Sequence, residues 1–188
     1  MRFTAFLAIF IALIMLGSRS PVLAGGSDTP GSRKKAQLIL GDGDTVRVEY
    51  SPLAVKSDSP GQRLMDGKVW SPGSGEATSF NTAAILDFGE NSKLPPGQYS
   101  LYLEPSGDTW ILIINQEIGQ AANTYPDGWD IVRTPMKKRE LSTPVPQLAF
   151  SFERHGPKGG TLKLSFGKTE ISVPFKEVPP EAGLPDSS

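Results

Sequence analysis

The chain has 188 residues, which is the length of one domain, and it contains no cysteine. A chain without cysteine forms no disulfide and offers no thiolate to a metal or a substrate. Its 19 basic residues nearly balance its 20 acidic residues. Because a weakly acidic protein has no electrostatic attraction to phosphate groups, we expect no nucleic-acid partner.

Residues 1–24 have the organisation of a secretory signal peptide. Arg2 precedes an apolar run over residues 3–16, and Ala24 supplies the small residue that signal peptidase accepts. A membrane anchor is the competing interpretation, but a spanning helix needs about 20 apolar residues and this run is shorter. We therefore expect export to the periplasm or beyond the cell, a mature chain that begins near Gly25, and no membrane span after cleavage.

Two segments that flank the expected domain have little to bury. Residues 25–36 are rich in glycine, serine, proline and lysine, and residues 177–188 contain three prolines. Both compositions favour a flexible leader and a disordered tail. The folded domain is therefore expected to span residues 37–176.

Between these segments apolar and polar residues alternate with a period of two, which is typical of β-strands with one wet face. The alternation predicts strands around residues 46–50, 99–103, 148–152, 162–166 and 171–175. In the second of these strands, Tyr102 is expected on the wet face. The uniformly apolar run over residues 110–114 predicts a central strand that is covered on both faces.

Turn residues separate the expected strands. Asp42-Gly43 predicts a hairpin, and Gly167-Lys168 predicts a two-residue turn. His155 lies in the loop that should join the strands at residues 148–152 and 162–166, and no segment has a helical stripe. Many short strands with such turns favour an all-β fold, a single antiparallel β-sandwich or barrel-like domain with irregular loops.

The residues that usually perform catalysis are scarce. His155 is the only histidine, so a histidine-rich metal site is excluded, and we expect neither a metal nor a cofactor. One catalytic alternative needs carboxylates alone: a carbohydrate hydrolase that uses Glu76 and a second acid roughly 5–9.5 Å away. The available partners are Asp66, Asp87 and Asp130.

The loop that ends at Thr78 contains more chemistry than folding requires. Trp70 offers a flat apolar face that suits stacking on a sugar ring. Gly73 permits close approach of the backbone, while Glu76 and Thr78 supply hydrogen-bonding groups. We expect this loop to hold any small-molecule or glycan ligand.

Three motifs, in order, make the chain similar to the bacterial domain of unknown function 2911. The family pattern reads Trp-Arg-Thr-Gly-Ala-Asn-Glu-Ala-Thr, then Leu-Pro-Ala-Gly-Thr-Tyr-Ser-Leu, then Trp-Thr-Val-Ile-Phe/Leu-Asn. The matching residues here are Trp70, Gly73, Glu76, Ala77, Thr78, Leu94, Pro95, Gly97, Tyr99, Ser100, Leu101, Trp110 and Asn115. The arginine and the asparagine of the first motif are replaced by Ser71 and Gly75 in this chain.

Asp130 and Arg133 fit a later Asp-x-x-Arg element of the same family. The resemblance therefore implies that these two residues join Trp70, Gly73, Glu76 and Thr78 as ligand-binding candidates. It implies a domain from about Leu38 to Phe175 in an exported protein, and it implies no reaction.

Three function classes follow from the sequence. The first is a non-catalytic binding or envelope-associated module, and the second is the carboxylate-dependent hydrolase. The third is a structural or assembly partner. A structural interpretation of the loop also stays open, in which Trp70 plugs the end of the sandwich and Glu76 caps a turn or pairs with Arg133.

Overall fold

The computed structural model describes residues 33–54, 68–89, 92–106 and 109–180. The predicted signal peptide, most of the predicted leader and the candidate acid Asp66 lie outside these residues. The described part contains strands and no helix, so it holds no helix that is long and apolar enough to cross a membrane. Its strands are β1 Lys34–Ile39, β2 Thr45–Tyr50, β3 Thr78–Thr82, β4 Leu86–Asp87, β5 Lys93–Leu94, β6 Gly97–Ser106, β7 Thr109–Asn115, β8 Asp130–Arg154 and β9 Gly159–Glu177.

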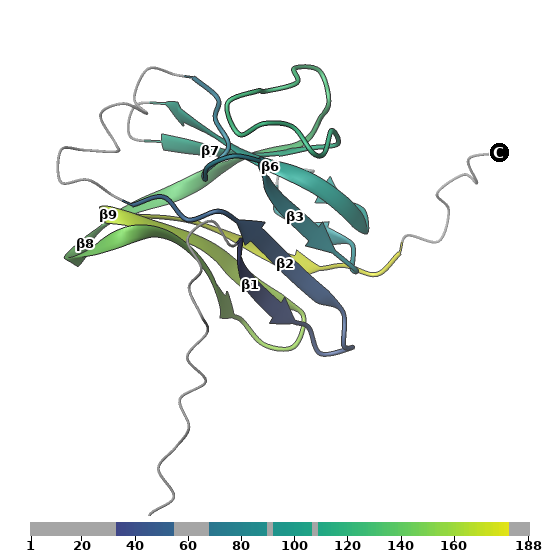
Figure 1. Cartoon of the computed structure of the whole chain (residues 1–188). Coiled ribbons are helices and arrows are strands. Elements are labelled where there is room, and N and C mark those ends of the chain that lie inside the picture. The colour runs from purple at the N-terminus through teal and green to yellow at the C-terminus, as the bar shows by residue number, and fades with distance from the viewer. Residues whose placement is uncertain (1–32, 55–67, 90–91, 107–108, 181–188) are drawn as a thin grey trace, which may run out of the picture. The chain divides into compact units, whose positions relative to one another are not determined.

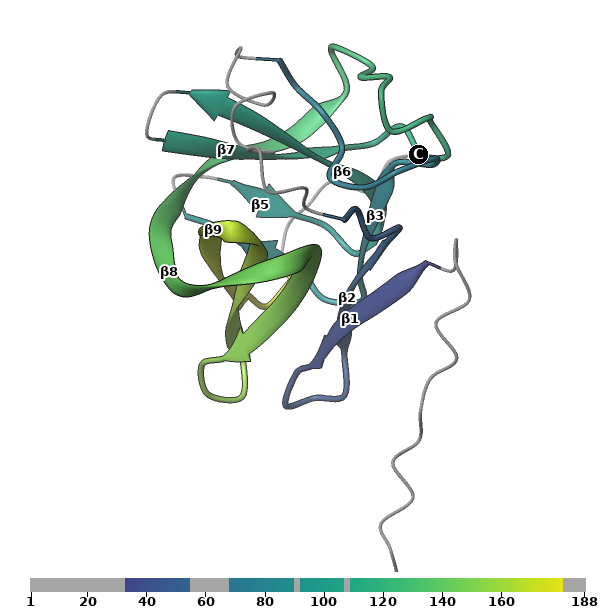
Figure 2. The ribbon, with the colours of Figure 1, turned by 60° about the vertical axis from the view of Figure 1, so that its left-hand side comes forward.

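These strands form one antiparallel sheet in the order β1-β2-β3-β6-β7-β8-β9-β4-β5 (Figure 1). The sheet is not closed, because β1 and β5 are its two edges. Its corner is β8, which pairs with β7 over residues 130–136 and with β9 over residues 137–154. Figure 2 shows the long β8 and β9 strands curling together away from β7. The predicted all-β fold is confirmed.

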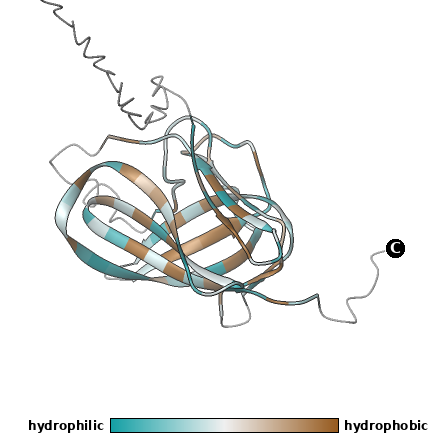
Figure 3. Ribbon diagram, turned by 90° about the horizontal axis from the view of Figure 1, so that it is seen from below, coloured by the Kyte–Doolittle hydropathy of each residue, from teal (hydrophilic) through white to brown (hydrophobic). Residues whose placement is uncertain are grey.

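The main hydrophobic core lies between the two parts of the folded sheet. Val48 of β2, Phe80 of β3, Leu112 of β7 and Leu164 of β9 are all fully buried in it. Burial of such a side chain contributes roughly 1.5–3 kcal/mol. Apolar and polar bands alternate along the strands in Figure 3, as the period of two predicts.

Two predictions about individual strands are wrong. Tyr102 was expected on a wet face, but it is 0% exposed because two loop segments cover that face of β6. The turn predicted at Gly167-Lys168 is absent, because β9 continues through both residues. Gly167 has a φ of +53° and lies opposite Val145, where the β8–β9 register shifts. A bulge therefore bends the strand where a reversal was expected.

The other turns follow the sequence. The hairpin at Asp42-Gly43 joins β1 to β2, with Gly43 at a φ of +93°, and His155 is exposed in the β8–β9 connection. Lys34 begins β1, three residues before the expected domain boundary at residue 37. β9 ends at Glu177, one residue after the expected boundary at residue 176.

An ion pair links β8 to β9 near their bend. Arg139 Nε donates to Glu170 Oε1 at 2.6 Å, and Glu170 is only 7% exposed. This hydrogen bond favours the ionised carboxylate, so it lowers the pKa of Glu170 below its ordinary value.

We expect Glu170→Gln to destabilise the fold at neutral pH and to matter less in acid. A carboxyl whose pKa is lowered by folding stabilises the protein above its unfolded pKa, about 4.3 for glutamate. That contribution is lost as the pH falls through the lower folded-state pKa. Urea unfolding at pH values on both sides of this window should show the stability gap between wild type and variant narrowing in acid. An equal gap at every pH, or an equal effect of the exposed control Glu140→Gln, would contradict this assignment.

Candidate functional site

Two loop segments, residues 68–77 and 116–129, cover the face of β6 and β7 that points away from the main core. We call this the outer face. Tyr102 and Ile113 on this face form a second apolar cluster with Ala77 of one segment, while Tyr125 of the other segment packs against the cluster. The rings of Tyr102 and Tyr125 meet edge to face, with centroids 5.3 Å apart. The outer face is therefore partly a second core.

Ser71 fastens the first segment to the sheet. Trp70 extends the sheet by pairing with Leu103 through two backbone hydrogen bonds, of 3.0 and 2.9 Å. Ser71, which is 1% exposed, donates from Oγ to the Leu101 carbonyl at 2.8 Å and accepts from the Thr78 N–H at 2.7 Å. One buried hydroxyl thus satisfies a donor and an acceptor of the backbone.

Thr78 and Gly73, both predicted to bind a ligand, make structural contacts in the same segment. Thr78 Oγ1 donates to the Pro72 carbonyl at 2.5 Å. Gly73 has a φ of +152°, and a Cβ at this position would lie 3.1 Å from the Ser51 carbonyl oxygen. A larger residue therefore does not fit at Gly73 without a shift of the backbone.

Backbone hydrogen bonds join the two segments to each other. Ala122 N–H donates to the Gly75 carbonyl at 2.7 Å, and Ala77 N–H donates to the Gln120 carbonyl at 2.8 Å. Between these contacts the side chain of Glu76 is exposed. The loops therefore form one layer over the outer face.

The side chains of Trp70 and Glu76 go to different places. Trp70 is half-buried and packs against the main core, and its buried Nε1 has no hydrogen-bond partner among the described residues. Glu76 is exposed and lies 3.5 Å from Arg33 Nη1. The alternative pairing of Glu76 with Arg133 is wrong, because Arg133 pairs with Glu104 and Asp130.

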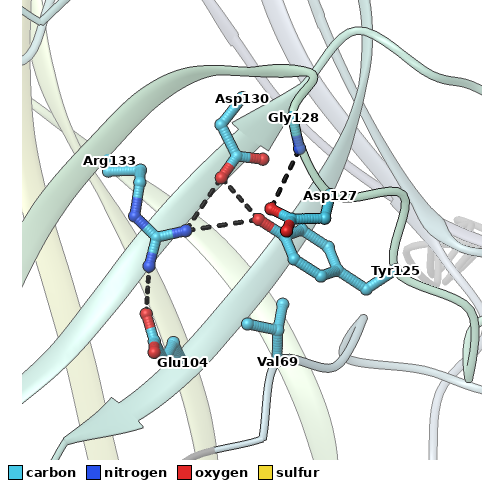
Figure 4. A pocket seen from close by; sticks show the side chains of 7 residues that line it. All are labelled: Val69, Glu104, Tyr125, Asp127, Gly128, Asp130 and Arg133. Carbon is cyan, nitrogen blue, oxygen red and sulfur yellow. Dashed lines mark hydrogen bonds and ion pairs between the residues drawn. The ribbon is translucent and has the colours of Figure 1, made fainter.

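Asp130 and Arg133 lie together in a hollow of about 560 Å³ (Figure 4). We call it the Arg133 hollow. Val69 and Tyr125 supply its apolar surface, and three acids and one base supply its charges. Its lining residues are Val69, Glu104, Tyr125, Asp127, Gly128, Asp130 and Arg133.

The polar groups of the Arg133 hollow hold one another in place. Arg133 Nη1 donates to Asp130 Oδ2 at 2.8 Å, and Nη2 of the same guanidinium pairs with Glu104. The Tyr125 hydroxyl donates to Asp130 Oδ2 at 2.5 Å. Burial, and then the hydrogen bond to Asp130, raise the pKa of Tyr125, so this phenol stays protonated and remains a donor at neutral pH.

A β-bulge in β8 brings Asp130 and Arg133 to one side of the sheet. Residues three apart on a regular strand point to opposite faces. Here Asn115 pairs with Asp130 while the preceding residue of β7, Ile114, pairs with Val132, so β8 has one extra residue. The extra residue restores the common orientation, and both charged side chains face the outer side.

Asn115, at the end of β7, connects this bulge to the second loop segment. It is fully buried, and its Nδ2 donates to the Pro126 carbonyl at 2.9 Å and to Asp130 Oδ1 at 2.8 Å. Its Oδ1 accepts from the Glu117 N–H at 2.9 Å. The third family motif therefore ends in a residue that fixes both the loop and the carboxylate of Asp130.

Two further hollows flank the loops. The Trp70 hollow, of about 470 Å³, is lined by Trp70, Ser71, Gly73, Ser74, Gly75, Ala122 and Asn123. The Arg47 hollow, of about 370 Å³, lies over β2, β3 and β6 and includes Glu76. The six predicted site residues therefore do not form one site: Asp130 and Arg133 share a hollow, Trp70 and Gly73 share another, and Thr78 lines none of the three.

The acids proposed for hydrolysis are also separated. Asp87 lies on β4, where it pairs with Lys176 at 3.4 Å, and Asp130 lies in the Arg133 hollow without Glu76. Among the described residues no group of three or more histidine, aspartate or glutamate side chains is arranged to hold a metal ion.

A family model described as a protein of unknown function, DUF2911, matches residues 32–175. The chain belongs to the DUF2911 family. The resemblance found in the three motifs is thus confirmed. No curated protein and no solved structure matches the chain.

Glu104 and Tyr125 are the site residues that the sequence did not single out. Glu104 follows Tyr102 by two positions and therefore shares its face of β6, but that face was expected to be open to solvent. Tyr125 lies in a segment without any periodic pattern, so the sequence contains no signal for its position.

We expect Ser71→Ala to destabilise the protein by about 1–3 kcal/mol, because it leaves a buried backbone donor and a buried backbone acceptor without partners. Ser74→Ala, an exposed serine of the same segment, is the matched control and should cost no more than about 0.5 kcal/mol. Urea unfolding of the two variants measures the difference. Similar stabilities would show that Ser71 does not hold the segment.

Proposed function

We propose that this DUF2911 protein is an exported, non-catalytic binding module whose Arg133 hollow takes a small polyhydroxylated ligand, such as a sugar. The observation that carries the proposal is the convergence of Glu104, Tyr125, Asp130 and Arg133 on one hollow. Their hydrogen bonds to one another fix the groups before any ligand arrives. Preorganisation of this kind reduces the entropy lost on binding.

The chemistry of the hollow suits hydroxyl groups. Carboxylates accept hydrogen bonds, and a guanidinium only donates them, so adjacent hydroxyls find both partners within one site. Val69 and Tyr125 add apolar surface for the C–H face of a sugar ring. Three acids against one arginine disfavour an anionic ligand, so a neutral ligand fits best.

The hydrolase alternative receives less support. It requires Glu76 to face a second acid across a cleft. Asp87 and Asp130 lie elsewhere on the sheet, and the acid that shares the hollow of Glu76 is Glu49, which pairs with Lys35 and Arg47. Asp130 already bonds to Arg133, Tyr125 and Asn115. That set of contacts is typical of an orienting group in a binding site.

Binding is tested by titrating the protein with neutral hexoses, disaccharides and inositol at millimolar concentrations, followed by amide chemical shifts. Arg133→Lys keeps the charge and loses the planar fork, and Glu104→Gln keeps the size and loses the charge. We expect each variant to weaken binding about tenfold, the equivalent of one charge-assisted hydrogen bond.

Glu140→Gln is the matched control for these variants. It removes an exposed acid that lines a different hollow, next to Lys138 and Arg139 on β8, and should leave the affinity unchanged. The proposal fails if none of the probes shifts residues around Arg133, or if both site variants bind as tightly as the wild type while remaining folded.

Export is the second part of the proposal, and it rests on the sequence of residues 1–24. Expressed with this segment in a Gram-negative host, the mature protein should begin near Gly25 and be recovered from the periplasmic fraction or the medium. N-terminal sequencing of the purified protein checks the cleavage site. Recovery of the uncleaved chain from the membrane fraction would contradict this part alone.

A further inference from the structure

A second hollow on the outer face has chemistry unlike that of the Arg133 hollow. The Arg47 hollow lies on the open part of β2, β3 and β6, beside the loop layer. Two rows of side chains cross these strands. In one, Arg47 lies opposite Asn81, which lies opposite Gln98; in the next, Glu49 lies opposite Ser79, which lies opposite Ser100. Each row spans two strand spacings, or about 10 Å.

Two arginines in this hollow each have a donor that lies in an ion pair but makes no hydrogen bond. Nη1 of Arg33 and Nε of Arg47 are buried and make no hydrogen bond to any described residue. Both lie near carboxylates, Arg33 at 3.5 Å from Glu76 and Arg47 at 3.4 Å from Glu49, without hydrogen-bonding geometry. A buried donor without an acceptor is costly. The side chains of Arg33 and Arg47 are 26% and 36% exposed, so a rotation of either guanidinium would turn its donor toward an acceptor supplied by a ligand.

The polar side chains that β3 and β6 contribute to the Arg47 hollow are also available to hydrogen-bond a ligand. Ser79, Asn81 and Gln98 make no side-chain hydrogen bond within the part of the chain that the structure describes. An amide side chain both donates and accepts, and so pairs with another amide group. The two arginines and the two glutamates cancel in charge, which favours an uncharged ligand over an anion.

We propose that the Arg47 hollow binds the secondary amide of an N-acetylated sugar, at a site separate from the Arg133 hollow. The arginine donors bond to the carbonyl oxygen of the acetamido group, and Asn81, Gln98 or a glutamate takes its N–H. The exposed side chain of Ile118 at the rim offers apolar surface to the sugar ring. An extended peptide also contains secondary amides, but peptides usually add to the edge of a sheet, whereas this hollow lies on a face.

The test uses two trisaccharides with the same β-1,4 linkage, the trimers of N-acetylglucosamine and of glucose, which differ in the acetamido group. Titration of the isotope-labelled protein should give saturable shifts for the side-chain amides of Asn81 and Gln98 with the first trimer. The glucose trimer should bind at least about tenfold more weakly, since it lacks the carbonyl that the arginines bond.

Arg47→Met keeps the aliphatic stem and removes the guanidinium, and Asn81→Ala removes one of the two side-chain amides that line the Arg47 hollow. Both should weaken binding of the N-acetylglucosamine trimer about tenfold, while Glu140→Gln, which removes an exposed acid outside both hollows, should not change its affinity. Urea unfolding establishes that each variant is folded. If Arg47→Met does not fold, the affinity of Asn81→Ala alone tests the site.

Several outcomes overturn the inference. These are equal binding of the two trimers, shifts confined to the Arg133 hollow, no shifts with the N-acetylated trimer, or the same shifts with a blocked alanine tripeptide. Because the Arg133 variants and the neutral probes without an amide test the other hollow, either proposal can fail while the other stands.

Discussion

Two buried polar side chains, Ser71 and Asn115, hold two loop segments against a sheet face that solvent would otherwise cover. Each side chain hydrogen-bonds at least one buried donor and one buried acceptor. Both side chains are small and polar, so they contribute little apolar surface to a core. A buried backbone group without a partner costs about as much as a lost hydrogen bond, so the loops can lie on the sheet only if these contacts form. The Arg133, Trp70 and Arg47 hollows all border the loop layer.

The bulge in β8 performs a related function for the charged residues. Without the extra residue after Asp130, this carboxylate and Arg133 would lie on opposite sides of the sheet. With it, one guanidinium reaches two carboxylates, on β6 and on β8. Bulges commonly re-aim side chains next to functional sites, which agrees with the Asp-x-x-Arg spacing of the family element.

The sequence predicted parts of β2, β6, β8 and β9, because a period of two follows directly from strand geometry. It did not predict β3, whose first residue, Thr78, was assigned to the ligand-binding loop. It did not predict residues 130–147 of β8, where Pro135, Pro144 and Pro146 argue against a strand. The register shifts opposite β9 accommodate such a segment. The sequence pattern could not predict the burial of Tyr102 either, because that burial depends on loops whose positions are set by long-range hydrogen bonds. For the same reason the six candidate residues were grouped by motif, whereas the structure places Asp130 and Arg133 in one hollow, Trp70 and Gly73 in a second and Glu76 in a third, and buries Thr78.

The structure of the loop layer explains the two positions, Ser71 and Gly75, at which this chain departs from the family pattern. Gly75 has a φ of +77°, a conformation that asparagine tolerates better than most residues, so the family's asparagine and this glycine suit the same backbone. Ser71 is different, because its hydroxyl occupies a buried position between Leu101 and Thr78 that leaves no room for an arginine in the same orientation. In this chain the position therefore stabilises the loop. The guanidinium groups of the outer face come from Arg33, Arg47 and Arg133, so the chemistry offered to a ligand lies on either side of the loop, and Ser71 itself offers none.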